Sequence, residues 1–163
     1  MIYSKFKRWT LMTFNFSLFL LVLLVIAILK FYVDISSDSL LPLVLISLPV
    51  IFIFVWLVWG ELRTKILKIS IENDKISVKN FQGLGISKVF YFSEIDGFKT
   101  SILPSEYKDF EYLYLIKSGH KIVKVSEFYH KNYSELKMEI SKKCKNLGTQ
   151  KFNIVREFIE LFA

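Results

Sequence analysis

Two long apolar runs near the N-terminus constrain this chain more than any other feature. Residues 11–29 and 40–60 contain no charged side chain, over 19 and 21 residues respectively. At about 1.5 Å of rise per residue, either run would form a helix roughly 30 Å long, which matches the hydrocarbon thickness of a bilayer. We therefore expect two membrane-spanning helices, followed by a charged domain of soluble character.

The first run is expected to remain in the mature protein as an anchor. Basic residues precede it, but its apolar stretch is longer than the roughly 7–15 residues of a signal peptide, and no A-x-A cleavage site follows it. Because only residues 30–39 separate the two runs, the helices should form a tight antiparallel pair. Residues 1–65 are accordingly predicted to form a transmembrane hairpin.

Charged and aromatic residues at the ends of the runs predict the orientation of this hairpin. Positive charge is retained in the cytoplasm during insertion, and the segment between the runs carries the acids Asp34 and Asp38. Both termini of a multi-pass protein are therefore expected in the cytoplasm. The basic residues that flank the runs are expected to contact anionic lipid, and each contact should contribute about 1 kcal/mol of attraction to the membrane surface. These residues are Lys5, Lys7, Arg8, Arg63, Lys65 and Lys68. Indole rings favour the membrane–water interface, and the expected interface anchors are Trp9, Trp56 and Trp59.

The residues after the hairpin carry no signature of catalysis or of nucleic-acid binding. Residues 61–163 hold 18 basic and 13 acidic side chains, which are interspersed and do not form the basic patch typical of nucleic-acid binding. Cys144 is the only cysteine in the sequence, and neither His120 nor His130 has metal-ligand spacing to it. The sequence has no P-loop, G-x-S-x-G, H-E-x-x-H or C-x-x-C motif. We therefore expect no enzymatic activity, no metal and no cofactor, and a surface or capping role for His130.

Alternation of apolar and polar residues predicts short antiparallel strands after the hairpin. The first two strands have their apolar side chains on one face, and Asn73 and Asp74 form the turn between them. The six expected strands cover residues 67–72, 76–79, 88–93, 98–103, 111–117 and 121–125.

A single amphipathic helix is expected to close the domain. Asn132 and Glu135 have the spacing of a capping box, and apolar residues then recur every three or four positions as far as Leu147. Gly148 is expected to stop this helix. Residues 66–148 are thus predicted to form one cytoplasmic domain. Residues 149–163 are predicted to form a short amphipathic tail helix that docks on the domain, on a partner or on the membrane.

This order of elements resembles the small bacterial membrane proteins in which a pleckstrin-homology-like (PH-like) domain follows a two-helix anchor. The resemblance rests on the hairpin at 67–81, on the stretch at 89–98 with its SEIDGF sequence, and on the hairpin and helix at 112–147 with YSELKMEI. It implies an α+β protein of the bacterial inner (plasma) membrane, with an antiparallel β-sandwich or barrel capped by a C-terminal helix.

The resemblance also sets expectations for strand number and ligands. It implies seven strands, so the one beyond the six evident strands is either missing or hidden within 126–129. The phosphoinositide-binding members of the family carry basic residues in the first hairpin loop. Here that loop is the net-negative segment 72–75, so no specific phosphoinositide site is expected.

These features favour a non-enzymatic scaffold or interaction module that is held at the cytoplasmic membrane surface. Its partners would be the lipid bilayer and either another protein or a second copy of the chain, with no nucleic acid. The alternative is an accessory subunit of a membrane transport or envelope-stress complex, recognised through the transmembrane hairpin. In that case Asn15, Ser47 and Pro49 would matter most, Asn15 either bonding another helix or reaching interfacial water.

Overall fold

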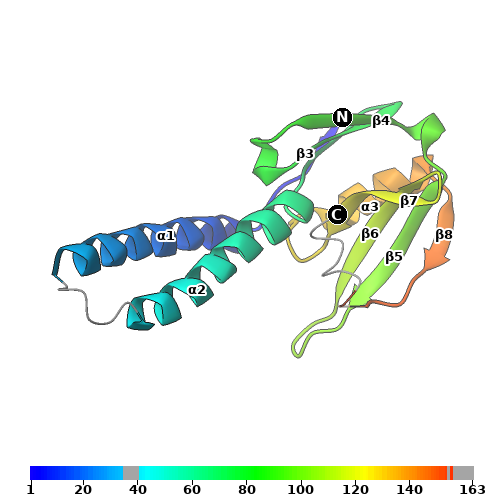
Figure 1. The fold of residues 1–163 in the computed structure, drawn as a ribbon. Helices are drawn as coiled ribbons and strands as arrows, with labels where there is room; N and C mark the ends of the chain where they lie inside the picture. Colours follow the sequence, from blue (N-terminus) through cyan, green and yellow to red (C-terminus); the bar gives the residue numbers. More distant parts are fainter. Residues whose placement is uncertain (35–40, 154, 156–163) are drawn as a thin grey trace.

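The computed structural model describes residues 1–34, 41–153 and 155, and it places apolar helices ahead of a β-rich domain (Figure 1). Helix α1 covers Arg8–Asp34 and α2 covers Leu41–Val55, after which the chain continues as a π-helix, η1, over Trp56–Leu62. α1 and α2 lie side by side and project together from one end of the domain.

Among the described residues, one of the two predicted spans is found at full length. Arg8–Lys30, within α1, is long and apolar enough to cross a membrane, either as an anchor or as a signal sequence. In the second predicted span, 40–60, the apolar helix is the shorter Ser47–Gly60. The helix also does not end at Gly60, because it continues through the π turns of η1. Length and composition therefore support one crossing and do not by themselves support the predicted second one.

The first sheet combines three consecutive strands with a strand from the far N-terminus. Its order is β1 (Ile2–Tyr3), β2 (Lys68–Ile71), β3 (Lys75–Lys79) and β4 (Ser87–Tyr91), and all neighbours are antiparallel. The predicted hairpin of β2 and β3 is confirmed, with alternate residues buried. Because β1 precedes α1 and β2 follows η1, this sheet joins the two ends of the helical pair.

The second sheet is a three-stranded meander with a parallel strand on one edge. β5 (Gly97–Leu103), β6 (Phe110–Lys117) and β7 (His120–Ser126) are antiparallel neighbours, and β8 (Asn146–Thr149) runs parallel to β5. The three predicted strands of the meander are confirmed to within one or two residues. Two short 3-10 helices flank β4, namely η2 (Phe81–Gly83) and η3 (Phe92–Glu94).

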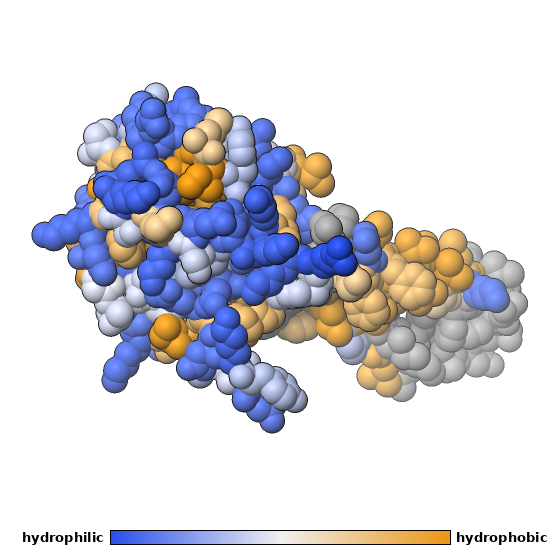
Figure 2. Space-filling model, turned by 180° about the vertical axis from the view of Figure 1, so that it is seen from behind, coloured by the Kyte–Doolittle hydropathy of each residue, from blue (hydrophilic) through white to orange (hydrophobic). Residues whose placement is uncertain are grey.

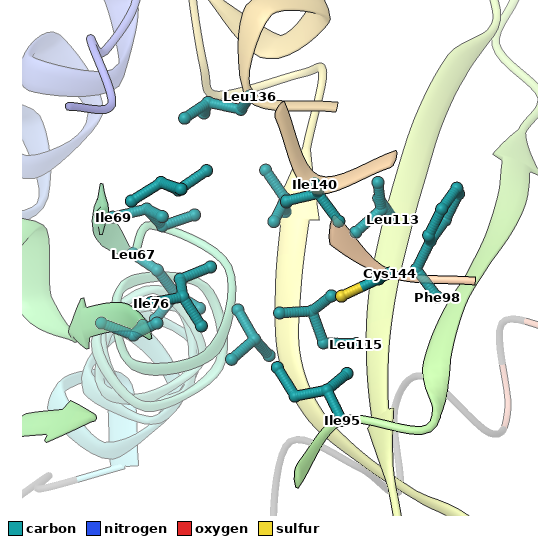
Figure 3. Packing of buried hydrophobic residues seen from close by; sticks show 14 of the residues in the cluster. Leu67, Ile69, Ile76, Ile95, Phe98, Leu113, Leu115, Leu136, Ile140 and Cys144 are labelled. Carbon is teal, nitrogen blue, oxygen red and sulfur yellow. The ribbon is translucent and has the colours of Figure 1, made fainter. Parts of the chain in front are cut away.

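Helix α3 (Tyr133–Lys143) places its apolar face in the core between the two sheets, as the spacing of its apolar residues predicts. Leu136 and Ile140 are fully buried, and Cys144 follows them into the same cluster. Figure 3 shows these side chains between Ile69 of the first sheet and Leu113 of the second. Burying one Leu or Ile contributes about 1.5–3 kcal/mol, so the helix holds the two sheets together.

The C-terminal part of the domain differs from the prediction. Strand β7 ends at Ser126 and residues 127–129 form a turn, so the stretch 126–129 does not hide a seventh strand, whereas β1 and β8 are strands that the sequence pattern does not reveal. Helix α3 ends at Lys143, so Gly148 lies in β8 and does not stop the helix. The cause is the parallel pairing of β8 with β5, which draws the chain into an extended conformation. The predicted tail helix lies largely outside the described residues.

Candidate functional site

The residues before α1 are built into the domain. Beyond the pairing of β1 with β2, Ser4 and Ile69 bond each other: the Ser4 amide donates to the Ile69 carbonyl, and the Ile69 amide donates to the Ser4 hydroxyl, both at 2.8 Å. Both residues are buried. The chain therefore enters α1 from a fixed point on the domain and returns from η1 to the neighbouring strand (Figure 1).

Asn132 binds this N-terminal segment through its side chain. Its Oδ1 accepts the Lys5 amide at 2.8 Å, and its Nδ2 donates to the Tyr3 carbonyl at 2.9 Å. The predicted capping box is therefore wrong, because Asn132 makes no side-chain capping bond to α3. Its oxygen is occupied by Lys5, and Glu135 instead accepts a bond from Nδ2 at 3.3 Å. Asn132 thus joins the start of α3 to the base of α1.

His130 is buried at the same junction, where the sequence favours a surface or capping role. It is 1% exposed; Nδ1 lies 2.9 Å from the Ser126 carbonyl oxygen and Nε2 lies 2.8 Å from that of Leu67. The Phe6 ring covers it at 5.4 Å between centroids. A neutral imidazole has one N–H and can donate to one of these carbonyls at a time. Burial lowers the pKa of His130, and the two carbonyl contacts oppose this effect without reversing it.

An apolar cluster surrounds the point where α1 and η1 meet the domain. We call it the junction cluster, and its members are Phe6, Trp9, Val58, Leu62, Ile66, Phe81, Phe128 and Tyr129. The Trp9 ring meets the Phe128 ring edge-on, with 4.3 Å between centroids; such pairs contribute about 0.5–1.5 kcal/mol beyond their buried area. Of the predicted interface anchors, Trp9 therefore packs on the domain, whereas Trp56 and Trp59 on η1 are exposed.

The six basic residues predicted to contact lipid flank this junction, but their surroundings differ. Lys7 turns inward: its Nζ donates to the Glu127 carbonyl at 2.7 Å and lies 5.5 Å from the centroid of the Phe110 ring. Burial lowers the pKa of Lys7, and the Glu127 carboxylate partly offsets this. Lys5, Arg8 and Lys68 are exposed, and Arg63 and Lys65 are half-buried. The exposed three are therefore the best placed to meet lipid headgroups.

The described part of the chain offers little for catalysis. Within it, no three His, Cys, Asp or Glu side chains come together in a group that could hold a metal ion. Cys144 is buried, which raises the pKa of its thiol despite the opposing charge of Lys143. Since the thiolate is the reactive form, burial disfavours reaction at this thiol. The expectations of no enzymatic activity and no cofactor stay predictions.

Sequence reasoning missed two features of this end of the domain. The first is the set of bonds that Ser4 and Asn132 make with distant backbone, for which no local signal exists. The second is a pair of exposed aliphatic side chains, Leu84 and Ile86, on the connection between β3 and β4. Aliphatic residues on either side of Gly85 in a predicted loop are a signal that could have revealed this pair.

No protein-family model matches the sequence, and no curated protein or solved structure matches it either. The resemblance to PH-like membrane proteins therefore gains no support from these comparisons. The architecture itself comprises an N-terminal apolar helix long enough to span a membrane, a second, shorter apolar helix, two four-stranded sheets, and a C-terminal helix packed between the sheets.

Proposed function

We propose that this chain is a membrane-anchored, non-enzymatic module, whose domain is held at the cytoplasmic surface of the plasma membrane to recruit another protein or a second copy of itself. The observation that carries the proposal is the pairing of β1 with β2, because these strands flank the apolar helices in the sequence. A domain tied to both ends of a helical pair stays directly beneath the membrane that the pair enters.

The same pairing supports two crossings. Because β1 and β2 lie in one sheet, a chain that crosses through α1 must return to the same side before β2. α1 has 27 residues and is about 40 Å long, and α2 has 15 residues and is about 22 Å long, to which the seven π-helical residues of η1 add. The first length exceeds the roughly 30 Å of bilayer hydrocarbon, and the second approaches it once η1 is included. Cleavage after α1, as for a signal sequence, would remove β1 from its sheet, so the pairing favours a retained anchor.

Charge and hydropathy support the cytoplasmic orientation. The exposed residues Lys5 and Arg8 lead into α1, and the exposed Lys68 begins β2, the next strand after η1, and positive charge is retained in the cytoplasm. Figure 2 shows a largely hydrophilic domain beside apolar helices. In a bacterium, the implied location is the inner membrane.

Cysteine accessibility in cells tests this topology. Single cysteines are placed at Ser37, between the helices, and at Ser134, exposed on α3, in a Cys144→Ala background. A membrane-impermeant maleimide added to intact spheroplasts should label Ser37→Cys and should label Ser134→Cys only after lysis. Labelling of Ser134→Cys from outside would overturn the orientation. Protection of Ser37→Cys until lysis would overturn the second crossing.

The alternative candidate, an accessory subunit recognised through its helices, is favoured by Asn15. α1 leaves this amide exposed on an otherwise apolar surface, and polar side chains inside membranes bond to partner helices. By contrast, Ser47 donates to the Val44 carbonyl at 3.2 Å within α2. Affinity purification from mildly solubilised membranes separates the two proposals. Loss of a co-purifying membrane protein in Asn15→Leu, but not in the control Phe16→Leu, would support the alternative, and retention in both would favour the scaffold.

A further inference from the structure

We propose that the connection between β3 and β4 is a second membrane contact, in which Leu84 and Ile86 insert into the interface of the leaflet from which α1 departs. This inference rests on the proposed function, since it requires the domain to lie at a bilayer. It adds a lipid-binding site outside the helices. We call residues 80–86 the docking loop.

Hydrogen bonds place the docking loop at the level where α1 begins. Gln82 donates from Nε2 to the Thr10 carbonyl at 3.4 Å, and from its amide to the Ile66 carbonyl at 3.1 Å. Thr10 directly precedes the apolar run 11–29, so in the anchored chain it lies at the membrane–water boundary. Figure 1 shows this connection at the end of the first sheet nearest the helices. The loop therefore faces the headgroup region.

The aliphatic side chains of the docking loop are at least as exposed as the aliphatic side chains on α1 and α2. Leu84 is 85% and Ile86 81% exposed, compared with 63% for Leu45 on α2 and 61% for Leu29 on α1. Scattered apolar residues on a surface are ordinary, but here two of them adjoin a helix that is able to span a membrane. Moving one such side chain fully out of water favours the buried state by roughly tenfold or more, so the bilayer interface is the environment that this pair fits.

The backbone holds the loop in a fixed shape. The Asn80 carbonyl accepts the amides of both Gly83 and Gly85 at 3.0 Å. Phe81 and Gln82 have left-handed φ values of 51° and 58°, followed by Gly83 at 101°. A bulky residue seldom adopts such a conformation, and packing of the Phe81 side chain in the junction cluster offsets the energetic cost of this backbone conformation. The loop is thus braced against the base of the helices, which leaves its aliphatic side chains outside.

Lysines beside the loop supply attraction to anionic headgroups. Lys68 at the start of β2 lies opposite Lys79 at the end of β3 in the strand register, and both are exposed. Like charges directly opposite each other destabilise a strand pair, and an anionic headgroup between them would relieve that repulsion. Lys88, exposed at the start of β4, lies at the same end of the sheet. Apolar side chains flanked by basic ones are typical of interfacial membrane binding.

Site-specific fluorescence on the full-length protein tests the site. The protein, in a Cys144→Ala background, is reconstituted into vesicles of phosphatidylcholine with or without phosphatidylglycerol. An environment-sensitive dye (NBD) is attached at Leu84→Cys, or at Tyr91→Cys as the matched control. Tyr91 is exposed on β4 and pairs with Lys75, at the opposite end of the strand. At position 84 the emission should shift to shorter wavelength and be quenched by lipids with nitroxide-labelled acyl chains, whereas position 91 should show neither effect.

A second set of variants leaves the reporter outside the site. With the dye at Ser87→Cys, replacing both Leu84 and Ile86 by serine should lower the docked population relative to the undocked one by roughly 100-fold, counting tenfold per side chain. Quenching in phosphatidylglycerol vesicles should also fall in Lys68→Glu/Lys79→Glu, but not in the control Lys145→Glu, since Lys145 is exposed just past the C-terminal end of α3.

The outcomes distinguish failure of this site from failure of the anchor. Loss of the protein from vesicles in an alkaline wash would overturn the proposed function and this site with it. Retention in the vesicles with equally water-exposed dye at positions 84 and 91 would overturn the docking loop alone, and would instead point to a protein ligand for Leu84 and Ile86.

Discussion

Replacing Asn132 by alanine should release the N-terminal segment while the rest of the domain stays folded. The change removes the acceptor of the Lys5 amide at 2.8 Å and the donor to the Tyr3 carbonyl at 2.9 Å. Asn132 is 8% exposed, and each buried group left without a partner costs about 1–3 kcal/mol. Lys5 and Tyr3 border solvent, so each of the two backbone groups left without a partner should cost about 1–2 kcal/mol. We therefore expect the β1 pairing to lose about 2–4 kcal/mol of stability in total.

This cost should appear as easier local opening of β1. Amide exchange through a local opening follows the free energy of that opening, and each 1.4 kcal/mol corresponds to a factor of ten. Exchange in residues 1–7 should therefore accelerate by about 30- to 1,000-fold in Asn132→Ala.

Hydrogen exchange read by mass spectrometry on the full-length protein in lipid nanodiscs measures this effect. Asn146→Ala is the matched control, because the Asn146 side chain bonds the Gly148 amide at 2.8 Å on an exposed surface. Unchanged exchange of residues 1–7 in Asn132→Ala would refute the reasoning. Equal acceleration in α3 would show that Asn132 supports the whole domain and does not act locally on β1.

Two further changes test the junction and the core. His130→Gln should flatten the pH dependence of the thermal midpoint: the pKa of His130 is lowered from about 6.5 by folding, so the unfolded chain binds more protons and stability falls as the pH drops below that value. The exposed His120→Gln should keep the original profile, and a persisting slope in His130→Gln would contradict this assignment. Leu136→Ala should lower the free energy of unfolding by about 2–5 kcal/mol, whereas Met138→Ala, 55% exposed, should change it by about 0.5 kcal/mol at most. Similar losses in urea titrations of both would argue against the placement of α3 between the sheets.

Elements with local signals could be predicted from the sequence. Apolar residues alternate along β2 and β3, and they recur every three or four positions along α3. The local sequence of each element is therefore enough to predict its buried face. Basic residues and tryptophans at the ends of apolar runs also indicate where a membrane surface would lie, and their contact with lipid stays a prediction.

Features that depend on distant partners could not be predicted. β1 has two residues, too few to show any period, and its Tyr3 pairs with Ser70. His130 lies just before Lys131 and Asn132 in the sequence, which favours an exposed position, yet carbonyls from two separate segments contact both of its ring nitrogens. Gly148 reads as a helix stop because the parallel pairing of β8 with β5 leaves no mark in the adjacent sequence. Likewise, nothing near Lys7 in the sequence indicates that its ammonium group donates a hydrogen bond to the Glu127 carbonyl.

The pairing of β1 with β2 also sets an order of events during synthesis. Residues 2–3 leave the ribosome first, but their partners, residues 70–71, appear only after both apolar helices have been made. If the hairpin inserts as proposed, an N-terminus stranded on the far side of the membrane cannot reach its sheet. β2 then keeps an open edge, which is prone to pair with other chains. If the hairpin inserts as proposed, completion of the first sheet therefore requires that both ends of the hairpin lie on the same side of the membrane.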